Sequence, residues 1–559
     1  MRKRERQRLS RSGIPCGRAS RRQLALIFGS IALLAACGTK SEPGPPTVSA
    51  DSETLQGVSL DTHPSVAVFK GIPYAAPPVG ELRWRPPAPH SPRQGVQAAT
   101  EFGPACIQHP DHVPDWYRYL AETFDQDPAL VPELEPVSED CLNLNVWTAN
   151  LDGDEPWPVM VWIHGGANTS GSPSELPYDG ANMTRKGVVV VSFNYRLNVL
   201  GFLAHPALTA ESDHDSSGNY ALLDQIAALQ WIQRNIAAFG GDPERVTIFG
   251  ESAGATNVSY LMSSPLARGL FQRALMQSGG YGVSEFRDLA DQEAIGEGLV
   301  ATLGVAESED VLATLRAADA QDLLHAALEG YSSWSSEPNV DGWVLEEAPA
   351  RVFEAGRQAP VPLLIGFNSD EWTTLGHYGP DVTLESLHEV LRTEYGDLAD
   401  RAIELYPASS DEEAAEMVDL SQTDLWFACP SRFIAERMAR ASSEAYFYLF
   451  SRSLPTPGGD RLGAYHGAET AYVMDNLALE SWVPRENYDQ ELADAMSDYW
   501  VQFASTGDPN GGDNPVWPKY GSDSQQYLEL GSSIRTGTGI RTEYCSLYDE
   551  LQRQRLGSE

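Results

Sequence analysis

The feature that most constrains the fold is a series of short, fully apolar segments that recur along the chain. They lie at residues 159–163, 188–191, 246–249, 363–365 and 446–450. A half-exposed strand alternates apolar and polar residues, whereas a continuous apolar run fits a strand that is covered on both faces. We therefore expect these segments to be strands of one buried sheet.

Helical patterns lie between the expected strands. In residues 220–239 the apolar positions step by three or four, which places them on one face of a helix, and Gly-Gly-Asp-Pro at 240–243 ends the pattern. Strands that alternate with helices predict an α/β fold with a large, mostly parallel, doubly wound central sheet and helices on both faces. We expect residues 52–559 to form this single domain, with residues 104–135 as an excursion over the sheet edge.

The N-terminus predicts a targeting segment. A basic stretch at 2–22 precedes an apolar run of thirteen residues at 24–36, which is too short to span a bilayer and suits the core of a signal peptide. The run ends in Leu-Ala-Ala-Cys-Gly, which resembles the lipobox of bacterial lipoproteins. We expect a signal peptide over 1–36, lipidation of Cys37, and a flexible tether over 37–51. The alternative is a plain secretory signal, which would give a periplasmic or secreted protein.

The chain is strongly acidic, with a formal net charge of -39. The negative electrostatic field of such a charge disfavours nucleic acid and anionic lipid surfaces as binding partners. In the expected domain four cysteines remain, and an even number in an exported protein predicts two disulfides, for which three pairings are possible. Their spacing is not that of a zinc site, and we expect no metal.

One motif predicts a nucleophile. An apolar strand runs directly into Gly250-Glu251-Ser252-Ala253-Gly254, and a helical stretch follows. This order suits a serine on a strained turn whose hydroxyl stands above the sheet, because the two glycines let strand and helix approach closely. The N-terminus of the following helix then faces the developing oxyanion. We expect Ser252 to be the nucleophile.

A second motif predicts donors for that oxyanion. His164-Gly165-Gly166-Ala167 follows the expected strand 159–163 and lies upstream of the serine. The glycines let the backbone turn its N–H groups inward, as acyl transfer requires. A simple turn at the strand end is the alternative, and the pairing with the serine motif argues against it.

A base and an acid should follow the serine along the chain. His466 lies in a glycine-flanked loop after the strand 446–450, whereas His388 lies in an expected surface helix and His377 is close to a strand end. We expect His466 to be the base. The acid follows the strand 363–365, and physical reasoning leaves Asp370 and Glu371 both open.

Long motifs in a fixed order carry a resemblance from about residue 57 to residue 548. They are Phe-Lys-Gly-Ile-Pro-Tyr-Ala-Ala-Pro-Pro at 69–78, Ser-Glu-Asp-Cys-Leu-Asn-Leu-Asn-Val at 138–146, Asn-Tyr-Arg at 194–196, Leu-Asp-Gln at 223–225, Phe-Gly-Gly-Asp-Pro at 239–243 and the serine motif. The chain resembles the type-B carboxylesterase family, which includes cholinesterases and bacterial para-nitrobenzyl esterases.

The resemblance implies an α/β-hydrolase fold and a serine hydrolase of small-molecule carboxylic esters that acts through an acyl-enzyme without a cofactor. It implies Glu371 as the acid and His466 as the base. Oxyanion donors are implied at Gly166, Ala167 and Ala253. The disulfides that it implies are Cys106–Cys141 and Cys429–Cys545.

The sequence departs from the family at two positions. Ala167 stands where the family often has a third glycine, and Asn168 stands where an aromatic residue is usual, which affects the expected pocket shape. Glu251 is expected either to tune the field at His466 or to be a buried hydrogen-bonded carboxyl. We expect Ser278 to support the site rather than to react.

Two other functions remain open from the sequence. A lipase for longer-chain esters would favour a long exposed apolar lid, which we do not identify. A non-catalytic binding module, as in relatives that lost the serine, is disfavoured by the intact set Ser252, Glu371 and His466. Either a monomer or a dimer is compatible with the sequence.

Overall fold

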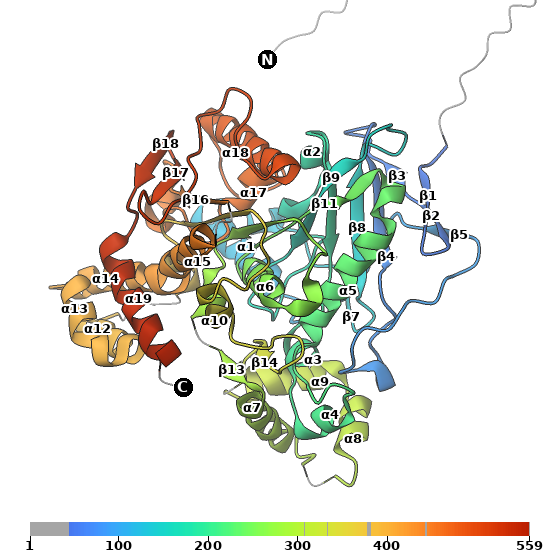
Figure 1. Cartoon of the computed structure of the whole chain (residues 1–559), viewed down its shortest axis with the longest axis horizontal. Coiled ribbons are helices and arrows are strands. Elements are labelled where there is room, and N and C mark those ends of the chain that lie inside the picture. The colour runs from blue at the N-terminus through green and yellow to red at the C-terminus, as the bar shows by residue number, and fades with distance from the viewer. Residues whose placement is uncertain are drawn as a thin grey trace, which may run out of the picture. The chain divides into compact units, whose positions relative to one another are not determined.

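A large mixed sheet organises the molecule (Figure 1). The computed structural model describes residues 44–284, 286–306, 308–332, 334–376, 382–441 and 444–557. In these residues an 11-stranded sheet has the order β18-β17-β16-β15-β12-β11-β9-β10-β8-β4-β3. Its strands are β3 Val58–Ser59, β4 Ala67–Pro73, β8 Asn143–Thr148, β9 Trp157–Ile163, β10 Val189–Phe193, β11 Gly241–Glu251, β12 Arg273–Gln277, β15 Leu363–Asn368, β16 Ala445–Phe450, β17 Gln526–Leu530 and β18 Ile534–Thr538.

The pairing confirms the expected mostly parallel sheet. Every neighbouring pair from β17 to β10 is parallel, and the pairs at the two ends of the sheet are antiparallel. All five apolar runs of the sequence lie in strands or, for Val188, directly before one. The prediction holds because parallel strands covered on both faces need apolar side chains on both faces.

Alternate residues of β9 show the two-sided burial directly. Val159, Val161 and Ile163 belong to one hydrophobic core, whereas Met160 and Trp162 belong to the other. The first core contains apolar residues of α5, α6 and α15, and the second contains those of α17 and α18. Helices therefore cover both faces of the sheet, as the α/β-hydrolase fold requires.

The helices are as follows: α1 His112–Thr123, α2 Ala181–Thr184, α3 Asn198–Phe202, α4 Pro206–Glu211, α5 Tyr220–Asn235, α6 Ala253–Ser263, α7 Leu289–Thr302, α8 Val311–Ala317, α9 Ala320–His325, α10 Pro349–Glu354, α11 Trp372–Leu375, α12 Leu384–Tyr395, α13 Ala399–Leu405, α14 Asp411–Thr423, α15 Cys429–Arg440, α16 Pro457–Leu462, α17 Thr470–Val473, α18 Asn487–Thr506 and α19 Thr542–Gly557. None of the helices in the described residues combines the length and the apolarity that a membrane crossing needs.

The helix expected over 220–239 is α5 with a 3₁₀ turn at Ile236–Phe239. It ends at Gly240, whose φ of 77° is the left-handed conformation that glycine adopts without steric cost. The Gly-Gly-Asp-Pro segment therefore ends the helix, as predicted.

The structure corrects the predicted tether. Its last part forms strand β1 (Thr47–Ala50), which pairs antiparallel with β2 (Glu53–Gln56) in a three-stranded sheet completed by β5 (Val96–Ala98). Val48 and Ala50 are buried, which is the alternation of a paired strand rather than of a tether. Residues from Pro45 onward belong to one compact unit. The predicted signal peptide and Cys37 lie outside the described residues.

Both implied disulfides are present, Cys106–Cys141 and Cys429–Cys545. The first closes the excursion over the sheet edge, which contains α1 and the two-stranded ladder of β6 (Ala105–Cys106) and β7 (Val137–Ser138). A further two-stranded ladder joins β13 (Arg287–Asp288) to β14 (Asn339–Val340).

Candidate active site

Ser252 occupies a strained turn between β11 and α6. Its φ and ψ are 55° and -126°, a region that a residue with a Cβ rarely adopts, at a cost on the order of 1–3 kcal/mol. The flanking glycines make the turn possible: a Cβ on Gly250 would lie 2.5 Å from the carbonyl oxygen of Ile163, and one on Gly254 would overlap the same oxygen. The glycines thus serve the close approach that the motif predicted.

Three backbone N–H groups near the serine turn have no hydrogen-bond acceptor among the described residues. Gly166 and Ala167 follow β9 in left-handed conformations, with φ of 93° and 53°, and Ala253 is the first residue of α6. Within the part of the chain that the structure describes, none of the three N–H groups has a hydrogen-bond acceptor. Such unpaired donors at a helix N-terminus and a glycine turn are suited to an oxyanion.

The structure brings Glu371, rather than Asp370, to His466. Nδ1 of His466 lies 2.6 Å from Oε2 of Glu371, whose Oε1 accepts from the N–H of Asn368 at 2.7 Å. Oδ2 of Asp370 instead accepts from the N–H of Ala464 at 2.9 Å, which fixes the start of the histidine loop. The two acidic neighbours therefore have different tasks. His388 lies on α12, and His377 lies outside the described residues.

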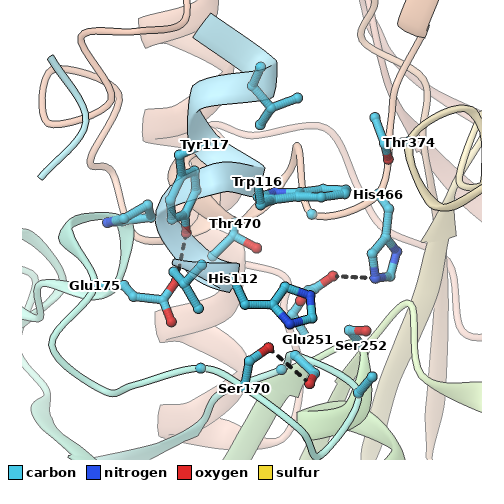
Figure 2. A pocket seen from close by; sticks show the side chains of 18 of the residues that line it. His112, Trp116, Tyr117, Ser170, Glu175, Glu251, Ser252, Thr374, His466 and Thr470 are labelled. Atoms are coloured by element: carbon cyan, nitrogen blue, oxygen red, sulfur yellow. Dashed lines mark hydrogen bonds and ion pairs between the residues drawn. The ribbon is translucent and has the colours of Figure 1, made fainter. Parts of the chain in front are cut away.

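The other nitrogen of His466 faces Glu251. Nε2 lies 3.2 Å from Oε1 of Glu251, and Figure 2 shows this contact directly beside Ser252. Burial raises the pKa of the Glu251 carboxyl, although the charge of His466 opposes the shift. Burial lowers the pKa of His466, but the charge of Glu251 and the hydrogen bond to Glu371 outweigh it, and the pKa is raised above its ordinary value. Glu251 thus affects the histidine electrostatically.

A buried amide and a further carboxyl, which the sequence reasoning missed, hold the histidine loop. Nδ2 of Asn368 donates to the carbonyl oxygen of Tyr465 at 2.8 Å and to Oε2 of Glu469 at 2.6 Å. Oε1 of Glu469 accepts from Gln277 Nε2 at 3.3 Å. Glu469 follows the expected base His466 by three residues, and this spacing was a sequence signal that could have pointed to it.

Ser278, which was expected to support the site, bonds to β15 through its backbone. Its N–H donates to the carbonyl oxygen of Gly366 at 3.0 Å. Its side-chain hydroxyl is buried and has no hydrogen-bond partner among the described residues. The carbonyl oxygen of the preceding residue, Gln277, accepts from the N–H of Ser252 at 2.9 Å. The end of β12 therefore holds the serine turn.

A cavity of about 330 Å³ opens above these groups. Helix α1 lies across it, as Figure 2 shows, and contributes His112, Val113, Trp116, Tyr117 and Leu120 to its lining. The remaining lining comes from the segment after β9, the serine turn, α11, the loop of His466 and the chain from α17 to residue 480: Gly165, Gly166, Ala167, Ser170, Gly171, Glu175, Pro177, Tyr178, Glu251, Ser252, Thr374, Leu375, Tyr465, His466, Gly467, Thr470 and Glu480. The excursion predicted over the sheet edge is therefore the roof of the site.

A hydrogen bond joins α1, which covers the cavity, to the segment that follows β9. Tyr117 of α1 donates to Oε2 of Glu175 at 2.8 Å, and Oε1 of Glu175 accepts from the N–H of Ser172 at 2.8 Å. Burial raises the pKa of Glu175 to about 7. The position of α1 is thus tied to the segment that follows the oxyanion loop.

Comparisons with known proteins agree on one family. A model of the carboxylesterase family matches residues 44–548. The chain is 36% identical over 498 residues to the fumonisin B1 esterase of Sphingopyxis macrogoltabida, covering 88% of this chain and 87% of that protein. It is 32% identical to mouse carboxylesterase 1C, covering 94% and 96%. A solved structure of PNB esterase superposes with a TM-score of 0.77 at 32% identity, covering 90% of this chain and 99% of that one.

Proposed function

Because the chain belongs to the carboxylesterase family and is a carboxylic ester hydrolase, we propose that Ser252, His466 and Glu371 are its catalytic triad. The observation that carries the proposal is the 2.6 Å contact between His466 Nδ1 and Glu371 Oε2 in the cavity that Ser252 also lines. A carboxylate at Nδ1 fixes the tautomer whose Nε2 accepts a proton, and it stabilises the imidazolium that results.

The proposed reaction has two halves. The oxygen of Ser252 attacks the ester carbonyl carbon while Nε2 of His466 takes the hydroxyl proton, and the N–H groups of Gly166, Ala167 and Ala253 stabilise the oxyanion. The carbon–oxygen bond to the alcohol then breaks, and His466 returns the proton to the leaving alcohol. Water attacks the acyl-enzyme by the same steps and releases the acid and free Ser252.

We also propose that Glu251 affects this reaction through its contact with His466. A protonated His466 cannot accept the serine proton, and Glu251 favours the protonated form through its contact with Nε2. The neutral histidine, which is the active form, therefore predominates only at a higher pH than for an isolated imidazole. The rate should rise as the pH passes the raised pKa.

We propose that the substrate is a small-molecule carboxylic ester. The cavity of about 330 Å³ is roofed by α1, which is tied down by the contact of Tyr117 with Glu175. A roof in this position disfavours a long, straight acyl chain. The lipase alternative requires α1 to move, and chain-length preference decides between the two.

We also propose export and lipid anchoring through Cys37. The two disulfides support an oxidising compartment, since such bonds form and persist outside the reducing cytosol. The variant Cys37→Ser should move the protein from the membrane fraction to the soluble fraction of a bacterial host after export. An unchanged membrane fraction would contradict lipidation at this residue.

A chain-length series tests the triad and the substrate class together. The domain from residue 45 onward should hydrolyse nitrophenyl acetate and butyrate faster than palmitate. Ser252→Ala should lower kcat/KM by at least about 10³-fold, because the nucleophile is lost. The matched control Ser263→Ala, in the last turn of α6, the helix that follows Ser252, should retain activity. A folded wild-type protein without esterase activity would sink the proposal, and a preference for palmitate would favour the lipase.

The pH profile tests the effect of Glu251. In the wild type we expect the acidic limb of kcat/KM to lie above pH 6.5, the ordinary pKa of histidine. Glu251→Gln removes the negative charge beside Nε2, so the pKa of His466 should fall and the limb should move to lower pH. Glu480→Gln, which removes another carboxyl of the cavity, serves as the control and should leave the limb in place. An acidic limb that does not move in Glu251→Gln would refute the effect of Glu251 on the pKa of His466.

A further inference from the structure

We infer that Asn168 and Asn257 are positioning residues for the oxyanion hole, and that one buried hydrogen bond between their side chains sets the spacing of its donors. The inference rests on the proposed function, because it concerns the same N–H groups. Nδ2 of Asn257 donates to Oδ1 of Asn168 at 2.9 Å. Asn168 is 5% exposed and Asn257 is fully buried.

This bond joins the two segments that carry the donors. Gly166 and Ala167 lie in the loop after β9, directly before Asn168, whereas Ala253 begins α6. Asn257 follows Ala253 by one helical turn, so its position is fixed relative to the N–H of Ala253. The bond therefore links the loop that carries Gly166 and Ala167 to the helix that begins at Ala253.

The side chain of Asn168 is turned away from the cavity. Gly166, Ala167 and Ser170 of this loop line the cavity, while the amide of Asn168 faces α6. The position where relatives usually carry an aromatic residue therefore contributes to the support of the loop, and does so through a polar contact. The contact with Asn257 explains how asparagine is accommodated at position 168, where the family usually has an aromatic residue.

The loop needs such support because its conformation is unfavourable. Gly166, Ala167 and Asn168 are consecutive left-handed residues, with φ of 93°, 53° and 56°. Only glycine adopts this region freely, and asparagine tolerates it better than most other residues. A strained segment persists only where its surroundings over-determine it.

Asn168 is held on both its side chain and its backbone. Its carbonyl oxygen accepts from the N–H of Asn198 at 2.8 Å. Nδ2 of Asn198 in turn donates to the carbonyl oxygen of Ile107 at 2.6 Å. Together with the bond to Asn257, these contacts hold Asn168 by its side chain and by the peptide that follows it, and so anchor the end of the segment that carries the N–H of Ala167.

The consequence for catalysis concerns the transition state. Oxyanion donors act on the charge that develops there, and a displacement of about 1 Å costs roughly 10²-fold in rate. Loss of the bond should therefore lower kcat with little effect on KM. A bond that merely satisfies two buried amides would affect stability and leave kcat unchanged.

A double-mutant cycle tests the inference. Asn168→Gly removes the amide but keeps the left-handed conformation accessible, and Asn257→Ala removes the donor. With nitrophenyl acetate, each variant should lower kcat by about 10- to 100-fold with KM within about threefold. The kcat of the double variant should be no lower than that of the more impaired single variant, because both substitutions remove the same bond. Ser259→Ala, a buried residue of the same helix, is the matched control and should keep its kcat.

An inhibitor series separates positioning from folding. Active-site concentration is measured by titration with a phosphonate ester, so that unfolded protein does not count. The affinity for a trifluoromethyl ketone analogue, which forms the tetrahedral adduct, should fall by the same factor as kcat, while the affinity for the matching methyl ketone should not.

Unchanged kcat per titrated site, or additive losses in the double variant, would overturn the inference. An inactive wild type would instead contradict the proposed function.

Discussion

The parallel pairing of β9 with β11 is the constraint on which the site depends. In its register Ile163, the last residue of β9, lies opposite Gly250, two residues before Ser252. The carboxyl ends of the two strands therefore place the loop of Gly166 and Ala167 and the serine turn at the same edge of the sheet. Glycines at 250 and 254 are needed because the carbonyl oxygen of Ile163 occupies the space that their Cβ atoms would fill.

Burial of charge around His466 is the second organising feature. Glu371 and Glu251 contact its two nitrogens at 2.6 Å and 3.2 Å, and both carboxyls are buried. Unpaired buried carboxylates are costly, so the arrangement depends on the imidazole that lies between them and on the N–H of Asn368, which donates to the other oxygen of Glu371. The same arrangement that orients the histidine also raises its pKa, which couples the proposed activity to pH.

Much of the fold and part of the site could be predicted from the sequence, because their signals are local. Apolar runs, the helix end at Gly240 and the serine motif each lie in contiguous residues. The choice between Asp370 and Glu371 could not be made on physical grounds, since it depends on which side chain turns toward His466, 95 residues away. The Asn168–Asn257 bond, 89 residues apart, and the bonds of Asn368 are contacts of the same long-range kind. The pairing of β1 with β2 was missed because the polar composition of that segment concealed its alternation.

Trapping of the acyl-enzyme decides most directly whether Ser252 is the nucleophile. The domain is mixed with nitrophenyl acetate, quenched in acid during the first turnover, and digested for peptide mass spectrometry. We predict one acetyl group on the peptide that contains Ser252, and none on that peptide in Ser252→Ala. Hydrolysis without acetylation of this peptide, or acetylation of another residue at the rate of turnover, would contradict it.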